Sequence, residues 1–133
     1  MRPEDRKKDI LIPVFCCEYS TAEDGINSTP EDLLRMARDD SDSPIEMECS
    51  LDGVDLKPHY VETGPFNISV PSNHLLTNEN ADPGTHTAVT VGYWHLLKPL
   101  PPGKHKLRFG GINKQGFHTK IECIVNVPSI EKQ

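Results

Sequence analysis

The segment from Thr87 to Gly111 reads TAVTVGYWHLLKPLPPGKHKLRFGG, and it decides the fold expected for the chain. Its first half, Thr87–Lys98, is rich in β-branched and aromatic residues, which favours a strand. Pro99–Gly103 forms a stiff reversal, and His105–Phe109 is expected to return as the second strand of a hairpin. The glycine pair Gly110–Gly111 ends that strand, where it indicates a bulge or a close approach of two backbones.

Short apolar runs elsewhere predict further strands. Ile45–Leu51 alternates between apolar and polar residues, which is typical of a half-buried strand, and Asp52-Gly53 is a hairpin turn signal. Ile10–Tyr19 is apolar on both alternating sets of residues, which indicates a strand covered on both faces or one at an edge, where Pro13 needs no backbone donor. Together with the two strands of the hairpin, the expected strands are Ile10–Tyr19, Ile45–Leu51, Val54–Tyr60, Pro65–Pro71 and Phe117–Val127.

One helix is expected near the N-terminus. Thr29 can cap it, Pro30 suits the first helical position, and Asp32 stands where a capping box has its acid. The apolar residues Leu33, Leu34, Met36 and Ala37 form a short stripe, and the helix should end ahead of Pro44.

Composition supports a small, mainly β protein. The 133 residues include 12 prolines, and only 35% are hydrophobic. An interior proline costs a helix about 3 kcal/mol, so a helical bundle is excluded. We therefore expect a single antiparallel β-sandwich over residues 10–128, with jelly-roll and immunoglobulin-like topologies both open. Residues 1–9 and 129–133 are expected to be solvated tails.

The charge and the N-terminus restrict the partners. A formal net charge of −6 gives no basic face for phosphates, so nucleic acid is not an expected partner. No apolar run is long enough to cross a membrane. Ile10–Cys17 lacks the pattern of a leader peptide, so the chain as presented indicates a cytoplasmic protein or a mature form.

The cysteines favour free thiols over disulfides. Cys16 and Cys17 are adjacent and would point to opposite faces of a strand. Cys49 and Cys123 are core-facing, as in an immunoglobulin domain, but the single Trp94 does not fit that framework. No CxxC pair is present, so a structural zinc site is not expected.

The stretch Gly92–Gly111 resembles a pattern shared by uncharacterised bacterial, often secreted, β-rich proteins: GYW, then LKPLPPG, then a histidine and FGG. The resemblance extends to Ile12–Phe15 (IPVF), to Ala22–Arg38 and to Leu51–Gly53 (LDG), so it covers most of Ile10–Val127. It implies one compact β-rich domain and no catalytic residue, and it leaves the cellular location open because many members are secreted.

Two groups of side chains are candidate sites. In the expected hairpin His95 and His105 are diagonal neighbours on one face, and His86 on the long Ser72–His86 loop could join them around a ligand. Ordinary strand histidines are the favoured interpretation, so no metal or other cofactor is expected. Tyr93 and Trp94 could stack on a sugar, although Trp94 and Phe109 are more simply explained as core residues.

Two classes of function remain open. The favoured one is a noncatalytic β-sandwich module that binds a partner protein, a glycan or a small ligand, with Tyr93, Trp94, His95, His105 and His86 as candidate contacts. The alternative is a small hydrolase or metal-dependent enzyme that uses His95, His105 and the loop 72–86. An exposed edge strand would also permit a homodimer.

Overall fold

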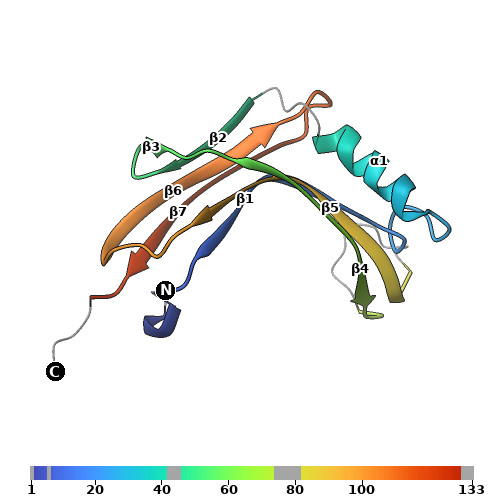
Figure 1. The fold of residues 1–133 in the computed structure, drawn as a ribbon, viewed down its shortest axis with the longest axis horizontal. Helices are drawn as coiled ribbons and strands as arrows, with labels where there is room; N and C mark the ends of the chain where they lie inside the picture. Colours follow the sequence, from blue (N-terminus) through green and yellow to red (C-terminus); the bar gives the residue numbers. More distant parts are fainter. Residues whose placement is uncertain (1, 6, 42–45, 74–81, 130–133) are drawn as a thin grey trace. The chain divides into compact units, whose positions relative to one another are not determined.

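The computed structural model describes residues 2–5, 7–41, 46–73 and 82–129. Within them the chain is mainly β, with two antiparallel sheets packed together as in a β-sandwich (Figure 1). The elements are η1 (Pro3–Asp5), β1 (Ile10–Ser20), α1 (Pro30–Ser41), β2 (Glu46–Leu51), β3 (Val54–Asp55), β4 (His59–Val70), β5 (Gly84–Leu97), β6 (Gly103–Ile112) and β7 (His118–Val127).

The strands form a three-stranded sheet in the order β1-β5-β4 and a four-stranded sheet in the order β3-β2-β6-β7. β1 and β4 are therefore edge strands, which suits Pro13 and Pro65 because an edge proline breaks no ladder. The edge position expected for Pro13 is confirmed.

The expected hairpin between Thr87–Lys98 and His105–Phe109 is wrong, because β5 and β6 belong to different sheets. The connection around Pro99–Pro102 carries the chain from one sheet to the other. Prolines lack the N–H groups that a tight hairpin would pair, so this segment can leave its sheet without losing ladder bonds. β6 pairs with β2 and β7 instead.

Strand limits differ from the expected ones mainly between residues 54 and 71. The expected strand Val54–Tyr60 is only two residues long, as β3, and the expected strand Pro65–Pro71 is the end of the longer β4. The expected start of β2 at Ile45 and the residues 74–81 of the long loop lie outside the described residues.

The chain divides into two compact units. The first, here called the sandwich unit, comprises Met1–Phe15, Ser43–His59 and Tyr93–Gln133. The second, called the helix unit, comprises Cys16–Asp42 and Tyr60–Gly92. β1 and β5 contribute residues to both units.

The core of the sandwich unit is made by strands alone. Its buried members are Ile12, Val14, Cys49, Leu97, Leu107 and Phe109, which come from both sheets. Cys49 is buried and Cys123 half-buried, and both are unbridged. The expected inward faces of Ile45–Leu51 and Phe117–Val127 agree with this core, since Met47, Leu51 and Cys123 pack against it.

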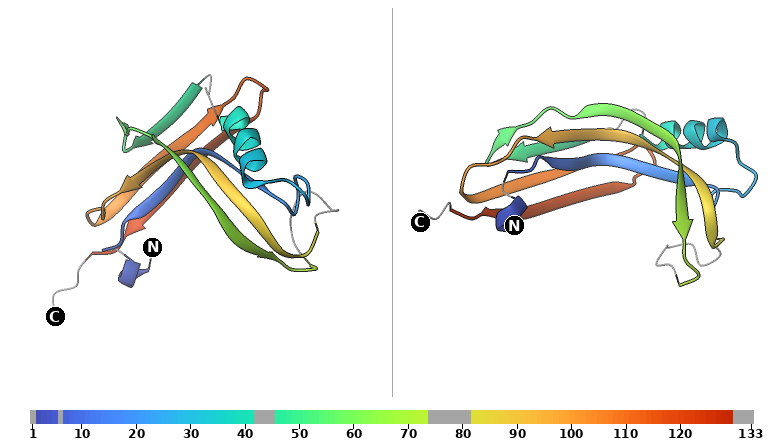
Figure 2. Two further views of the ribbon diagram at one scale, coloured as in Figure 1. Left: turned by 45° about the vertical axis from the view of Figure 1, so that its right-hand side comes forward. Right: turned by 60° about the horizontal axis from the view of Figure 1, so that its bottom comes forward.

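In the helix unit α1 lies against β1 and β5 (Figure 2). Leu33 and Ala37 are fully buried against Val89 and Val91. These two helical positions are four residues apart and lie on one face, so they present a single narrow apolar stripe to the sheet.

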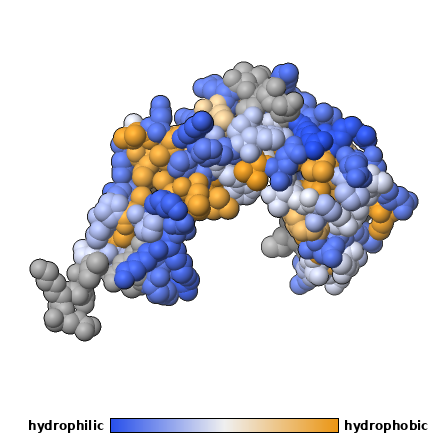
Figure 3. Space-filling view, in the orientation of Figure 1, coloured by the Kyte–Doolittle hydropathy of each residue, from blue (hydrophilic) through white to orange (hydrophobic). Residues whose placement is uncertain are grey.

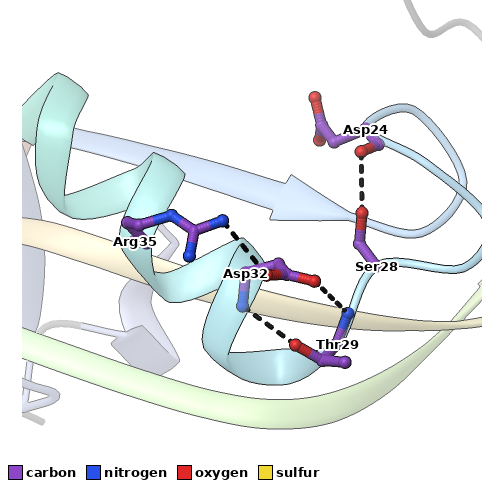
Figure 4. A network of polar contacts seen from close by, with 5 residues as sticks. All are labelled: Asp24, Ser28, Thr29, Asp32 and Arg35. Carbon is purple, nitrogen blue, oxygen red and sulfur yellow. Dashed lines mark hydrogen bonds and ion pairs between the residues drawn. The ribbon is translucent and has the colours of Figure 1, made fainter.

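The expected N-terminal cap of α1 is confirmed. The Asp32 N–H donates to Thr29 Oγ1 over 3.1 Å, and the Thr29 N–H donates to Asp32 Oδ2 over 3.0 Å, as Figure 4 shows. These bonds from Thr29, with Arg35 nearby, hold the pKa of Asp32 below its usual value. Aspartate therefore replaces the glutamate of a capping box without loss of either bond.

Polar bonds connect the rest of α1 to the sheet. Ser41 Oγ donates to the Val91 carbonyl over 3.0 Å and lies 2.9 Å from Cys17 Sγ. Arg38 makes a bidentate pair with Glu62, at 2.7 and 2.8 Å, and this pairing lowers the pKa of Glu62 to about 2. Tyr19 donates to Asp40.

Candidate ligand-binding site

His105 is the most constrained histidine of the sandwich unit. Its Nδ1 lies 2.7 Å from Asp52 Oδ2 and its Nε2 lies 2.8 Å from the Pro101 carbonyl oxygen. Both partners are acceptors, so only the imidazolium satisfies both bonds. The bond to Asp52, followed by the bond to Pro101, raises the pKa of His105.

Asp52 completes this network from the turn between β2 and β3. Its Oδ1 accepts from the Lys106 N–H over 2.7 Å, and its own N–H donates to the Lys106 carbonyl over 2.8 Å. The bonds from Lys106 and His105 lower the pKa of Asp52. The turn at Asp52-Gly53 and the start of β6 are thus joined through the buried ring of His105, and we call this network the clamp.

His95 has different partners. Its Nδ1 lies 2.7 Å from the Lys57 carbonyl oxygen, and its ring stacks on His59 with centroids 6.2 Å apart. The diagonal His95–His105 pair expected from the hairpin does not form, because their strands are not neighbours in one sheet. Within the described residues no three His, Cys, Asp or Glu side chains are grouped closely enough to hold a metal ion.

The aromatic candidates have separate roles. Phe109 is 8% exposed and belongs to the core, as expected. Tyr93 is half-buried and packs against the same core. Trp94 is also half-buried. Successive side chains of a strand point to opposite faces, so the side chain of Trp94 lies on the opposite face of β5 from that of Tyr93.

His86 belongs to the helix unit, where it lies in β5, so its expected place on the loop 72–86 is wrong. Its Nδ1 lies 2.8 Å from Thr21 Oγ1, and its Nε2 lies 3.4 Å from Asp82 Oδ2. Thr21 Oγ1 also accepts from the Thr87 N–H over 3.2 Å, and the Thr21 N–H donates to the Thr87 carbonyl. The Thr21–His86 bond thus joins the chain after β1 to β5.

Cys16 and Cys17, which could be drawn as nucleophiles, are poorly suited to that role. Burial raises the pKa of both thiols, that of Cys16 to about 11. A nucleophilic cysteine acts as the thiolate, which these surroundings disfavour.

A pocket of about 250 Å³ lies on the four-stranded sheet of the sandwich unit. It is lined by neighbouring residues of three adjacent strands: Glu46, Met47, Glu48, Gly110, Gly111, Ile112, His118, Thr119 and Lys120. None of the five residues selected from the sequence, Tyr93, Trp94, His95, His105 and His86, lines it.

The floor of the pocket exists because two glycines bring the strands close together. A Cβ on Gly110 would lie 2.0 Å from the Thr119 carbonyl oxygen, so no other residue fits there. A Cβ on Gly111 would lie 3.0 Å from the Phe15 ring and from the Glu46 carbonyl oxygen. The close approach expected for this glycine pair is confirmed, and both glycines line the pocket.

The walls of the pocket carry opposite charges. Glu48, Gly110 and Lys120 are register partners in one row across the sheet, and Glu46, Ile112 and His118 form the next row. Acidic side chains thus stand on β2 and basic ones on β7. Among the described residues Glu46, Glu48 and Lys120 form no ion pair, whereas Arg108 and Glu122 in the adjacent row are 2.7 Å apart.

Sequence reasoning found the parts of this pocket but not the whole. The alternation of Glu46 with Met47 and of His118 with Thr119 placed these charges on outward faces, and Gly110–Gly111 was singled out. The missing information was the strand order β2-β6-β7, which brings the three segments together.

No family model matches the chain, and no curated protein or solved structure is significantly similar to it. In the part of the chain that the structure describes, each helix is too short or too polar to cross a bilayer.

Proposed function

We propose that this chain is a noncatalytic β-sandwich module that binds a small zwitterionic ligand in the pocket above Gly110–Gly111. The observation that carries the proposal is the pair of oppositely charged walls of the pocket. Acidic residues stand on β2 and basic residues on β7, and Gly110 of β6 lies between them. The ammonium group of the ligand would lie near Glu46 and Glu48, and its carboxylate near Lys120 and His118.

The size and lining of the pocket favour an amino acid or a dipeptide. Its volume of about 250 Å³ is below the range of about 300–1,000 Å³ that is typical for drug-sized ligands. Ile112, between Glu46 and His118 in its row, adds apolar surface, which suits an aliphatic side chain. The charged groups that do not pair within the protein are available to a ligand, and charge-assisted bonds fix its orientation.

The use of the histidines supports binding over catalysis. His105 bonds Asp52 and a backbone carbonyl, and His95 bonds another carbonyl and stacks on His59. Both rings therefore stabilise local structure instead of acting as a catalytic base. A binding module requires neither a base nor a nucleophile.

The test is a titration of ¹⁵N-labelled protein with the dipeptide Gly-Leu. We expect saturable shifts of the Gly110, Gly111 and Thr119 amides, and about tenfold weaker binding for Glu48→Gln and for Lys120→Gln, as expected when one charged partner is lost. N-acetylated and C-amidated Gly-Leu should each bind more weakly than the free dipeptide. Lys104→Gln, on the same strand as Gly110 but outside the pocket, is the matched control and should bind normally.

Two results would contradict the proposal. One is a set of shifts that avoids Gly110 and Gly111, and the other is unchanged binding in both pocket variants.

A hydrolase is the second candidate, on other residues than the His95 and His105 expected from the sequence: His86 lies 2.8 Å from Thr21 Oγ1 and 3.4 Å from Asp82 Oδ2 in the helix unit. A hydroxyl beside a histidine that faces a carboxylate is the arrangement of an activated nucleophile. Hydrolysis of p-nitrophenyl acetate that is lost in Thr21→Val and in Asp82→Asn would support this function. A rate that both variants leave unchanged would exclude the three residues as catalytic.

A further inference from the structure

We infer that two copies of this chain pair through β7, antiparallel and in a register centred on Ile121, so that Lys120 of each copy faces Glu122 of the other. This inference rests on the free edge of the strand and on the order of charges along it. It shares Lys120 with the proposed ligand site, so variants at Ile121, which does not line the pocket, test the dimer separately from the ligand.

β7 is the outermost strand of its sheet. It pairs with β6 over its whole length, and no other strand in the described parts of the chain pairs with its second edge. Seven of its ten residues are exposed, including the large apolar side chains of Ile121 (45%) and Ile124 (48%). Figure 3 shows apolar side chains gathered over the region where β1, β5, β6 and β7 overlap in this view.

This edge has little protection against pairing. Natural edge strands avoid pairing through prolines, bulges, short length or charged side chains. β7 is a regular strand of ten residues without proline or glycine, and its charged residues Lys120 and Glu122 are of opposite sign. A long, exposed edge with an apolar face is a template for another strand.

The hydrogen bonds to β6 show which backbone groups face outward. The Asn113 N–H donates to the Phe117 carbonyl over 2.9 Å, so odd-numbered residues of β7 point their backbone groups toward β6. The N–H and C=O groups of the even residues, such as Lys120, Glu122 and Ile124, therefore face the free edge. An added antiparallel strand must place even residues opposite even residues.

Charge then selects one register. With Ile121 opposite its own copy, Lys120 lies opposite Glu122 of the second copy on the outward face, and the contact occurs twice. Because Glu122 already pairs with Arg108 and Lys106, the row across the two sheets alternates in sign. A shift by one step in either direction would instead place Lys120 opposite Lys120 or Glu122 opposite Glu122, and directly opposed like charges are destabilising.

The same register matches the other face. It places Phe117 opposite Val125 and Thr119 opposite Cys123, beside the central Ile121 pair. All of these are on the face directed to the core of the sandwich unit, so the exposed apolar side chains of the two copies would form one continuous strip. Burial of apolar area supplies the driving force that edge hydrogen bonds alone lack.

Cysteine cross-linking tests both the dimer and its register. In a Cys123→Ser background, Ile121→Cys should form an intermolecular disulfide, because centrally opposed residues that are not hydrogen-bonded have Cα atoms about 4.5 Å apart. Ile124→Cys is the control on the opposite face and should cross-link poorly. Faster cross-linking of Lys120→Cys or Glu122→Cys than of Ile121→Cys would overturn the register.

Solution mass tests the dimer without any new cysteine. Light scattering of the full chain should approach twice 14.9 kDa as the protein concentration rises. Lys120→Glu should weaken dimerisation about tenfold, since two opposite-charge contacts become like-charge contacts. Ile121→Lys should also yield monomers while Gly-Leu binding persists, because Ile121 does not line the pocket.

A monomer at every concentration, together with no disulfide at Ile121→Cys, would overturn the inference and leave the ligand proposal standing. A dimer that persists in both Lys120→Glu and Ile121→Lys would show that another surface pairs.

Discussion

The sandwich unit and the helix unit bury their sheets in different ways. In the sandwich unit strands cover strands, and the core gathers apolar residues from both sheets. In the helix unit one narrow stripe of α1 covers the sheet, and bonds from Ser41, Arg38 and Tyr19 surround it. β1 and β5 contribute to both units, so the same strands pack against a second sheet in one unit and against a helix in the other.

The difference indicates that a short helix with few buried side chains uses polar contacts to pack on its sheet. Two buried helical side chains, Leu33 and Ala37, provide much less apolar area than a sheet with Leu107 and Phe109. The polar bonds of α1 offset the missing area by fixing the orientation of the helix. Substitutions in the two units should therefore differ in size and in their dependence on pH.

The largest effect is expected in the sandwich core. Phe109→Ala removes a ring that is 8% exposed and leaves a cavity, so it should lower the free energy of unfolding by about 3–5 kcal/mol. Urea denaturation followed by circular dichroism measures this. Phe117→Ala, at a ring that is 58% exposed, is the matched control and should cost much less. Equal losses would mean that the sheets do not share the core described here.

A smaller loss is expected in the helix unit. Leu33→Ala should lower the free energy of unfolding by about 2–4 kcal/mol, because Leu33 is the largest fully buried side chain of α1. Hydrogen exchange should become faster in α1 than in β6 and β7, since the two units have separate cores. Uniformly faster exchange would show that the units unfold as one.

The local elements of both units could be predicted from the sequence. The strand Ile10–Tyr19, the alternation in Glu46–Leu51 and the cap at Thr29 were found because each signal is contained in a few adjacent residues. Periodicity and capping chemistry are local properties, and the structure follows them.

The pairing of strands could not be predicted in the same way. Thr87–Lys98 and His105–Phe109 are separate strands as expected, but they belong to different sheets. The residues of a strand do not specify which other strand pairs with it. The candidate pair His95–His105 depended on that pairing and was lost with it. The pocket could not be found for the same reason, since it requires Glu48, Gly110 and Lys120 to lie in one row.

The clamp of the sandwich unit should make its stability depend on pH. His105→Gln should lower the free energy of unfolding by about 1 kcal/mol, because it removes a hydrogen bond between charged groups at a partly exposed site. The folded pKa of His105 is raised, so its contribution is complete below the unfolded value of about 6.5 and is lost as the pH rises through the folded value.

The folded pKa of Asp52 is lowered, so the contribution of Asp52 is lost only as the pH falls through that folded value. The difference between the wild-type protein and His105→Gln should thus be greatest in mildly acidic solution and shrink toward alkaline pH. Denaturation midpoints measured across the pH range give the test. His59→Gln, at an exposed ring, is the control and should show no such trend.

The smallest of these effects is expected at the helix cap. Thr29→Ala removes the oxygen that accepts from the Asp32 N–H and should lower the free energy of unfolding by about 1 kcal/mol. Thr29→Ser keeps the hydroxyl and should be close to the wild-type protein, which separates the bond from the loss of the methyl group. Because the cap acts only on α1, the loss should appear as faster hydrogen exchange in the first turn of the helix and leave exchange in β6 unchanged. Equal exchange in Thr29→Ala and Thr29→Ser would show that the cap contributes nothing and that the apolar stripe alone holds the helix on its sheet.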